Sequence, residues 1–96
     1  MKPAEVIKQL EQRLADTELV DRDPNSILYT AREDVHQMLA YLRARRNKPR
    51  KGDIAVAVRI GEHLRHQVHT NPLYRQNPTA KYLALMAANY VRQLKY

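Results

Sequence analysis

Three histidines beside a carboxylate are the residues whose spacing comes closest to a metal site. His63, His66 and His69 recur at every third position, and Glu62 precedes the first of them. On a helix, His63 and His66 would share one polar face, but zinc requires three or four convergent ligands. His36 would have to join them from another segment, and the chain has no cysteine. We therefore predict no metal and no cofactor, with a pH-sensitive or phosphate-contacting histidine cluster as the alternative.

Patterns for covalent catalysis are equally sparse. Ser26 is the only serine, and it follows Pro24 and Asn25 in a turn instead of occupying a nucleophile elbow. Eight of the ten carboxylates lie in the first 34 residues without metal-ligand spacing, and no Gly-rich phosphate loop occurs. The sequence therefore predicts that the protein is not an enzyme and has no catalytic residues.

A run of cations is the strongest signal in the chain. No acidic residue occurs between Asp34 and Asp53, and six Lys or Arg residues fall within the nine positions 43–51. Such a run is not a packing surface, because each charge needs water or an anionic partner. Residues 1–34 hold eight acidic and five basic residues (net −3), whereas residues 35–96 hold two and twelve (net +10). This division favours an anionic binding partner over a merely solvated helix end. The predicted contacts are Arg43, Arg45, Arg46, Lys48, Arg50 and Lys51.

Two neighbouring features extend this prediction. If the preceding helix continues to Lys48, then Tyr41, Arg45 and Lys48 align on one face, where the tyrosine can stack on a base or a partner side chain. The last helix carries a second basic stripe that an ordinary solvent face explains equally well, formed by Lys81, Arg92 and Lys95 with Ala88 between them. Zinc-finger, RNP and basic-zipper patterns are absent. A helix-turn-helix is disfavoured because the linker 47–53 is longer than the tight turn of that motif.

Candidates for a protein interface lie in the last third of the chain. Tyr82 and Leu85 point away from the apolar stripe of their helix, and tyrosine is enriched at interfaces. A second buried side would account for them equally well. The segment 71–74 is expected to be an exposed loop and adds Pro72, Leu73 and Tyr74. The Asn71–Pro72 bond is interpreted as a turn, with a cis peptide or a prolyl-isomerase recognition site as the alternative.

The composition favours a small all-α domain that spans residues 1–96. The chain has no Phe, no Trp and only two glycines, whereas the helix-favouring residues Ala, Leu, Arg, Gln and Lys are abundant. No apolar signal core opens the chain, and no apolar run approaches the roughly 18 residues of a membrane span. We therefore expect a soluble, cytoplasmic protein that does not bind a membrane.

Turn signals divide the chain into three long helices and a less regular N-terminal one. The first helix begins at Pro3, and the second opens with a capping box at residues 30–33. Asp53 is expected to cap the third, where Gly61 interrupts the apolar stripe and predicts close approach of another helix. The fourth begins at Asn77-Pro78. The predicted core faces comprise Ile7, Leu10, Leu14, Val35, Met38, Leu39, Leu42, Ile54, Ala57, Val58, Leu64, Val68, Leu83, Met86, Ala87, Tyr90, Val91 and Leu94.

At whole-chain level the sequence resembles the small anti-RecBCD proteins of lambdoid phages. The resemblance rests on the length of the chain, on the basic segment 43–51 and on the loop 71–74. It implies a protein of the bacterial host cytoplasm that docks on the host recombination nuclease and alters its handling of DNA. It also implies a host prolyl isomerase as a second partner.

Two functions therefore remain open from the sequence. In the first, the protein binds a nucleic-acid-processing enzyme of the host and inhibits or modifies it. In the second, it binds DNA or RNA directly through residues 43–51. Both use Coulomb attraction through the same side chains. The first is favoured because the chain lacks every standard framework for reading a groove or stacking bases.

Overall fold

The computed structural model describes residues 1–94, and this part of the chain contains six helices and no strand. The helices are α1 (Pro3–Thr17), α2 (Ile27–Leu42), α3 (Ala44–Asn47), α4 (Lys51–Thr70), α5 (Pro72–Arg75) and α6 (Pro78–Arg92). The all-α prediction is confirmed. None of these helices is both long enough and apolar enough to cross a bilayer.

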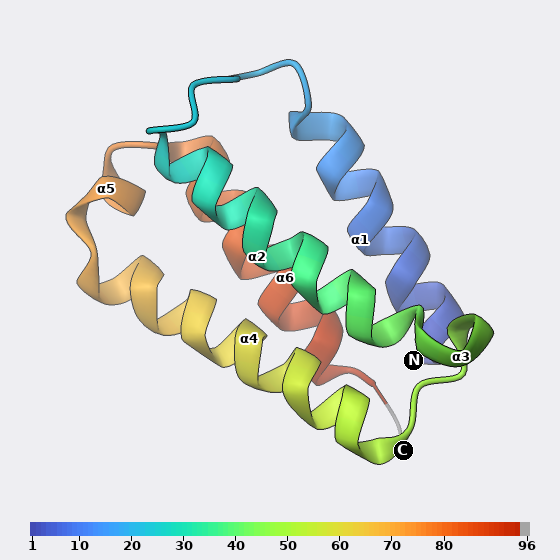
Figure 1. Cartoon of the computed structure of the whole chain (residues 1–96). Helices are drawn as coiled ribbons and strands as arrows, with labels where there is room; N and C mark the ends of the chain where they lie inside the picture. Colours follow the sequence, from blue (N-terminus) through green and yellow to red (C-terminus); the bar gives the residue numbers. More distant parts are fainter. Residues whose placement is uncertain (95–96) are drawn as a thin grey trace.

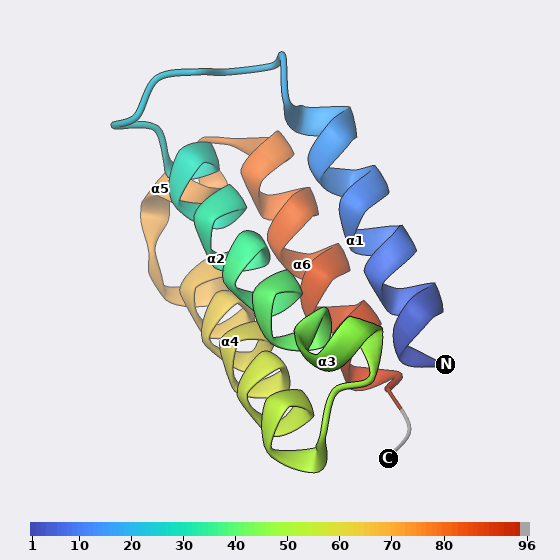
Figure 2. The same ribbon diagram turned by 45° about the vertical axis from the view of Figure 1, so that its right-hand side comes forward.

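The four long helices form a bundle in which α2 and α6 are central. Each of these two packs against both α1 and α4 as well as against the other (Figure 1). The short helix α5 connects the far end of α4 to the start of α6 and touches both (Figure 2). The bundle therefore has two distinct ends. One end carries α3 and the N-terminus, and the other carries α5 and the connection between α1 and α2 (Figure 1).

The apolar stripes meet in one core, as their 3.6-residue period predicts. Gly61 is buried where α4 crosses α6, and a Cβ built on it would lie 2.7 Å from Val91 Cγ2 and 3.3 Å from the Cα of Ala88. The predicted close approach of another helix at Gly61 is therefore confirmed. The buried side chains of the core include Leu10, Leu28, Met38, Leu39, Leu42, Leu64, Tyr74, Leu83 and Val91.

Two predicted helix starts are wrong by about one turn. Helix α2 begins at Ile27, and the Oγ of Ser26 accepts a hydrogen bond from the N–H of Leu28 at 3.2 Å. The earlier start lets Leu28 join the buried stripe, which outweighs the capping box expected at Thr30. Helix α4 begins at Lys51, so Asp53 stands at its third position and does not cap it in the expected way.

Two other starts follow the sequence signals. Helix α1 begins at Pro3, whose missing N–H costs nothing at that position. Asn77 caps α6, because its Oδ1 accepts the N–H of Ala80 at 3.1 Å. The interval before α6 holds the single turn of α5, where Asn71 Oδ1 accepts the N–H of Leu73 at 3.0 Å. Asn71–Pro72 therefore starts a helical turn, as interpreted from the sequence, and no peptide bond in residues 1–94 is cis.

Candidate binding surfaces at the two ends of the bundle

The connection between α2 and α4, residues 43–51, is called the cationic loop below. Helix α2 ends at Leu42, and Arg45, Arg46 and Asn47 then adopt left-handed backbone angles, with φ of 55°, 58° and 65°. The N–H groups of Asn47 and Lys48 close this turn on the carbonyls four residues earlier, each at 3.2 Å. Helix α2 therefore ends before Lys48, as Pro49 predicts, and it does not make the continuation to Lys48 on which the alignment depended. The face on which Tyr41, Arg45 and Lys48 were expected to align does not exist.

Three successive left-handed residues are an unusual feature for side chains with a Cβ. Each costs about 1–2 kcal/mol relative to right-handed geometry, because the Cβ approaches the following carbonyl oxygen. Such a conformation persists only where surrounding contacts hold it. Contacts of this kind must therefore be present around the cationic loop.

Two carboxylates contribute to those contacts. Arg43 Nη2 lies 3.0 Å from Glu11 Oε2 on α1. Asp53 Oδ2 accepts a hydrogen bond from Arg45 Nη1 and a second one, at 3.0 Å, from the backbone N–H of Arg50. The side chain of Asp53 thus ties both sides of the cationic loop to the first turn of α4. The sequence suggested Asp53 only as a helix cap, and its position three residues after Arg50 is the signal for the contact found.

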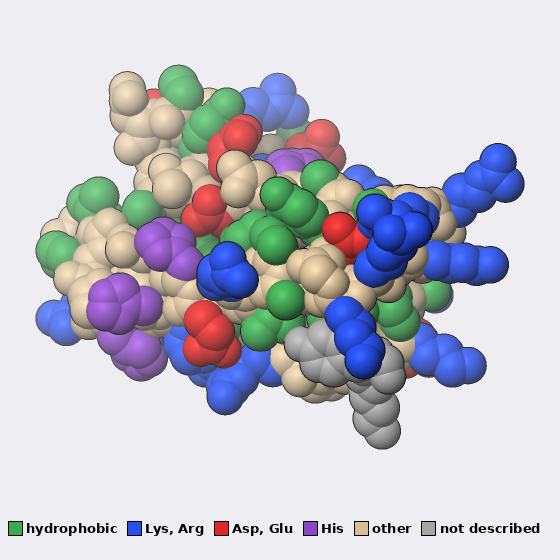
Figure 3. Space-filling view, turned by 60° about the horizontal axis from the view of Figure 1, so that its bottom comes forward, with side chains coloured by type: hydrophobic (Ala, Val, Ile, Leu, Met, Phe, Trp, Pro, Cys, Tyr) green, Lys and Arg blue, Asp and Glu red, His purple; other side chains and the backbone are tan. Residues whose placement is uncertain are grey.

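The remaining four cations of the cationic loop are exposed, and none makes an ion pair with another residue in the range 1–94. They are Arg46, Lys48, Arg50 and Lys51. Figure 3 shows Lys and Arg side chains projecting at the side where Figure 1 places α3, away from the histidines. Besides the paired Arg43 and Arg45, this loop thus presents four cations that have no acidic partner within residues 1–94. An anionic partner could therefore bind there without breaking an internal ion pair.

The opposite end of the bundle gathers exposed apolar side chains. Leu19 and Val20 lie in the connection between α1 and α2, at 76% and 57% exposure. Tyr29 lies in the first turn of α2, Leu73 in α5 and Tyr82 near the start of α6, and all three are exposed. Figure 1 places all of these segments at the end away from α3. We call these five residues the apolar end. Leu19 and Val20 were missed in the sequence, although an apolar pair within an acidic stretch is a recognisable signal.

The predicted interface residues divide into two groups. Pro72, Leu73 and Tyr82 are exposed as expected. Tyr74 is only 1% exposed, so its placement in an exposed loop is wrong; the single turn of α5 directs this side chain into the core between α4 and α6. Leu85 packs partly buried against the core and does not point away from it.

The second basic stripe on α6 is also not continuous. Lys81 is exposed, and Arg92 Nε lies 3.3 Å from Glu62 Oε1 on α4. Ala88, which was expected between the cations, is fully buried at the contact with Gly61. Lys95 falls outside the described residues. Helix α6 turns the small side chain of Ala88 inward, because α4 approaches too closely at this point for a larger side chain.

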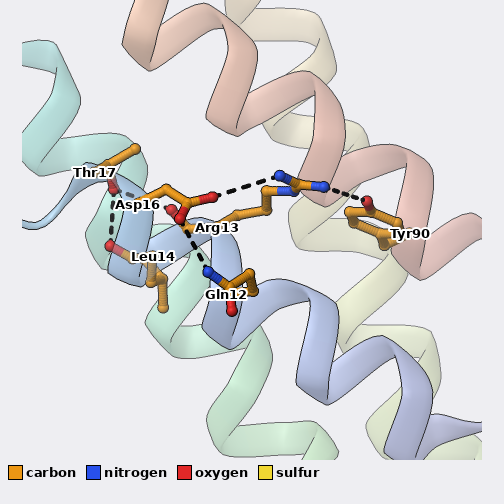
Figure 4. A network of polar contacts seen from close by, with 6 residues as sticks. All are labelled: Gln12, Arg13, Leu14, Asp16, Thr17 and Tyr90. Carbon is orange, nitrogen blue, oxygen red and sulfur yellow. Dashed lines mark hydrogen bonds and ion pairs between the residues drawn. The ribbon is translucent and has the colours of Figure 1, made fainter.

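A polar connection between α1 and α6 lies near Tyr82. Arg13 Nη2 donates a hydrogen bond to the hydroxyl of Tyr90 at 3.3 Å, and Nη1 lies 3.4 Å from Asp16 Oδ2 (Figure 4). The guanidinium carbon of Arg13 is 5.9 Å from the centroid of the Tyr82 ring. The hydrogen bond with Tyr90 is the main reason why the pKa of Arg13 is raised. This cluster borders a hollow of about 310 Å³ between the two helices, which holds Tyr82 at its edge.

The histidines stay on the solvent face of α4. His63, His66 and His69 are exposed, and residues 1–94 contain no group of three or more His, Cys, Asp or Glu side chains placed to hold a metal ion. His63 and Asp34 instead line the same groove, of about 450 Å³, between α2 and α4. Burial raises the pKa of Asp34, and the charge of His63 opposes that rise.

Two unlike surfaces thus stand at opposite ends of a bundle whose longest dimension is 35 Å. The cationic loop carries charge without large apolar side chains, whereas the apolar end carries tyrosine, leucine and valine side chains in contact with solvent. No protein-family model, no curated protein and no solved structure matches this chain.

Proposed function

We propose that this protein is a non-enzymatic binding protein that docks on a nucleic-acid-processing enzyme of a bacterial host and inhibits or modifies it. The resemblance to the anti-RecBCD proteins of phages suggests the recombination nuclease as that enzyme, with a prolyl isomerase as a further partner. The host cytoplasm is then the site of action.

The observation that carries the proposal is the separation of the cationic loop from the apolar end. Protein interfaces have an apolar centre enriched in tyrosine, and the apolar end offers Tyr29, Tyr82 and Leu73 as exposed side chains. Nucleic acid is recognised first through its phosphates, to which the four unpaired cations are suited. An enzyme that holds nucleic acid presents both kinds of partner surface at once. A bundle with one surface at each end can contact both.

Tyr82 offers the sharpest test of the protein contact. Tyr82→Ser in the full chain should lower recovery of the enzyme from a nuclease-treated bacterial lysate, because the substitution removes an aromatic side chain that is half exposed. Tyr41→Ser is the matched control, since Tyr41 is exposed to a similar degree but lies near the cationic loop. Retention of one host enzyme at stoichiometric yield, reduced by Tyr82→Ser alone, is the expected result. Equal recovery with both variants would contradict a contact through the apolar end.

Direct binding of DNA or RNA as the sole activity is the second candidate, and the unpaired cations favour it. The same experiment separates the two functions. If nuclease treatment removes every partner, the protein binds nucleic acid and the enzyme is recovered only through it.

A further inference from the structure

The chemistry of the cationic loop points to one class of ligand. Between Leu42 and Ile54 the chain contains six cations, and its other residues are Ala44, Asn47, Pro49, Gly52 and Asp53. No large apolar or aromatic side chain lies in this interval. A protein interface places such side chains at its centre, whereas a phosphate backbone requires only cations and polar donors. The cationic loop therefore suits a nucleic-acid backbone better than an acidic protein surface.

The conformation of the cationic loop also separates its six cations by role. Arg43 and Arg45 hold the loop, since each is paired with a carboxylate of an adjacent helix. Arg46 lies in the left-handed turn between these anchors and the unpaired residues Lys48, Arg50 and Lys51. A loop fixed in this way keeps its free charges close together. It loses less conformational entropy on binding than a flexible basic tail does.

We propose that the cationic loop is a preformed contact for a nucleic-acid phosphate backbone, with Arg46, Lys48, Arg50 and Lys51 as the phosphate contacts and Asp53 as the positioning residue. The negative charge of Asp53 acts against an anionic ligand, yet its carboxylate holds the side chain of Arg45 and the backbone of Arg50. The inference rests on the proposed function in one respect: the nucleic acid that the loop contacts is then the strand held by the enzyme.

The Asp53→Asn variant distinguishes a positioning role of the Asp53 carboxylate from an effect of net charge on DNA binding. The substitution raises the net charge of the protein by one, so long-range attraction alone predicts tighter binding to DNA. An amide binds the Arg45 guanidinium far more weakly than a carboxylate does, so loss of positioning predicts weaker binding. We expect weaker binding, by about threefold to tenfold, which corresponds to the net contribution of a typical hydrogen bond. Tighter binding by this variant would overturn the positioning role.

The phosphate contacts are tested with the purified full chain and a labelled DNA duplex, by fluorescence anisotropy over a range of salt. Four contacts predict a log–log slope of about −3.6, which is roughly a hundredfold loss of affinity for a fourfold rise in salt. Arg46→Gln should reduce the slope by about 0.9. Arg75→Gln is the matched control, because it removes the same charge from an exposed residue of α5, at the end of the bundle away from the cationic loop. Its slope should equal that of the wild type.

The outcomes test the phosphate contact of the loop separately from the proposed docking on an enzyme. Equal slopes for the Arg46→Gln and Arg75→Gln variants would overturn the assignment of the contacts, and so would the absence of duplex binding at low salt. If the chain fails to bind duplex while Arg46→Gln reduces enzyme recovery after nuclease treatment, the loop contacts an acidic protein surface and the inference is wrong. If the enzyme is not recovered but the slopes differ as expected, the proposed function fails and the phosphate contact stands. Circular dichroism of each variant checks that the fold is retained.

Discussion

Gly61 on α4 faces Val91 on α6 across a contact too short for another carbon atom, since a Cβ on Gly61 would lie 2.7 Å from Val91 Cγ2. Gly61→Leu should therefore destabilise the fold by roughly 1–3 kcal/mol or more, because α4 and α6 must move apart to admit the side chain. Gly52 is the matched control, as a Cβ on this residue would meet nothing within 4 Å. Gly52→Leu should leave the urea midpoint nearly unchanged or slightly raised. Equal effects of the two substitutions would argue against the helix contact.

The start of α2 yields a second matched pair. Ser26→Ala removes the oxygen that accepts the N–H of Leu28 and should cost about 1 kcal/mol of stability. Thr30→Ala alters an exposed residue inside the helix and should change the free energy of unfolding by only a few tenths of a kcal/mol. Urea denaturation of both variants measures the difference. The reverse order would restore the capping box at Thr30 as the true start.

The helical parts of the fold could be predicted because each depends on local spacing. Each long helix has an apolar stripe that follows the helix period and can be read from the sequence; Leu10, Met38, Leu64 and Val91 each belong to one of the four stripes. Gly61 was informative for the same reason, since a glycine within such a stripe needs a packing explanation. Helix starts were less certain because several capping residues compete. Burial of Leu28 decided between Ser26 and Thr30, and burial is a property of the whole fold.

The candidate site was predicted in composition but not in shape. The six cations identified the cationic loop, yet its left-handed turn at Arg46 follows two arginines that pair with Glu11 of α1 and Asp53 of α4. No local sequence pattern predicts contacts between this loop and carboxylates on two other helices. Tyr74 was misplaced for a related reason, because only the single turn of α5 determines which side chain of the segment points inward.

Burial of Tyr74 makes the stability of the protein depend on alkaline pH. Burial, with the nearby charge of Asp34, raises the pKa of Tyr74 to about 12. In the unfolded chain the hydroxyl ionises near pH 10, so above that pH the unfolded state binds fewer protons than the folded state. The stabilisation is complete below about pH 10 and is lost as the pH rises towards 12, by up to about 2 kcal/mol.

Tyr74→Phe tests this dependence. The variant should show a flatter fall of the urea midpoint between about pH 10 and pH 12, because its ring has no proton to lose. Tyr29→Phe is the control, since Tyr29 is exposed and its loss should leave the pH profile as in the wild type. A steep fall in all three proteins would assign the effect to other groups.

The histidines provide a test by metal removal. We expect the purified protein to contain no stoichiometric zinc, and its melting temperature to stay the same after treatment with a chelator. His63, His66 and His69 lie exposed on one helix without a third convergent ligand group in residues 1–94. A chelator-induced loss of several degrees would make them ligands. The His66→Gln variant would then show the same loss without chelator.

Asp34 lies half-buried in the groove between α2 and α4, where desolvation disfavours its charged form. Because burial raises its pKa, the folded state holds the ionised carboxylate less well than water does, and the penalty applies at neutral pH. Asp34→Asn should therefore raise the free energy of unfolding at pH 7. Glu33→Gln removes the same charge from an exposed neighbour and should have no comparable effect. The advantage of Asp34→Asn should shrink as the pH falls and the wild-type carboxyl becomes protonated in both states. Urea titrations at neutral and acidic pH measure it, and an advantage that persists unchanged in acid would show that the amide stabilises α2 through a hydrogen bond instead.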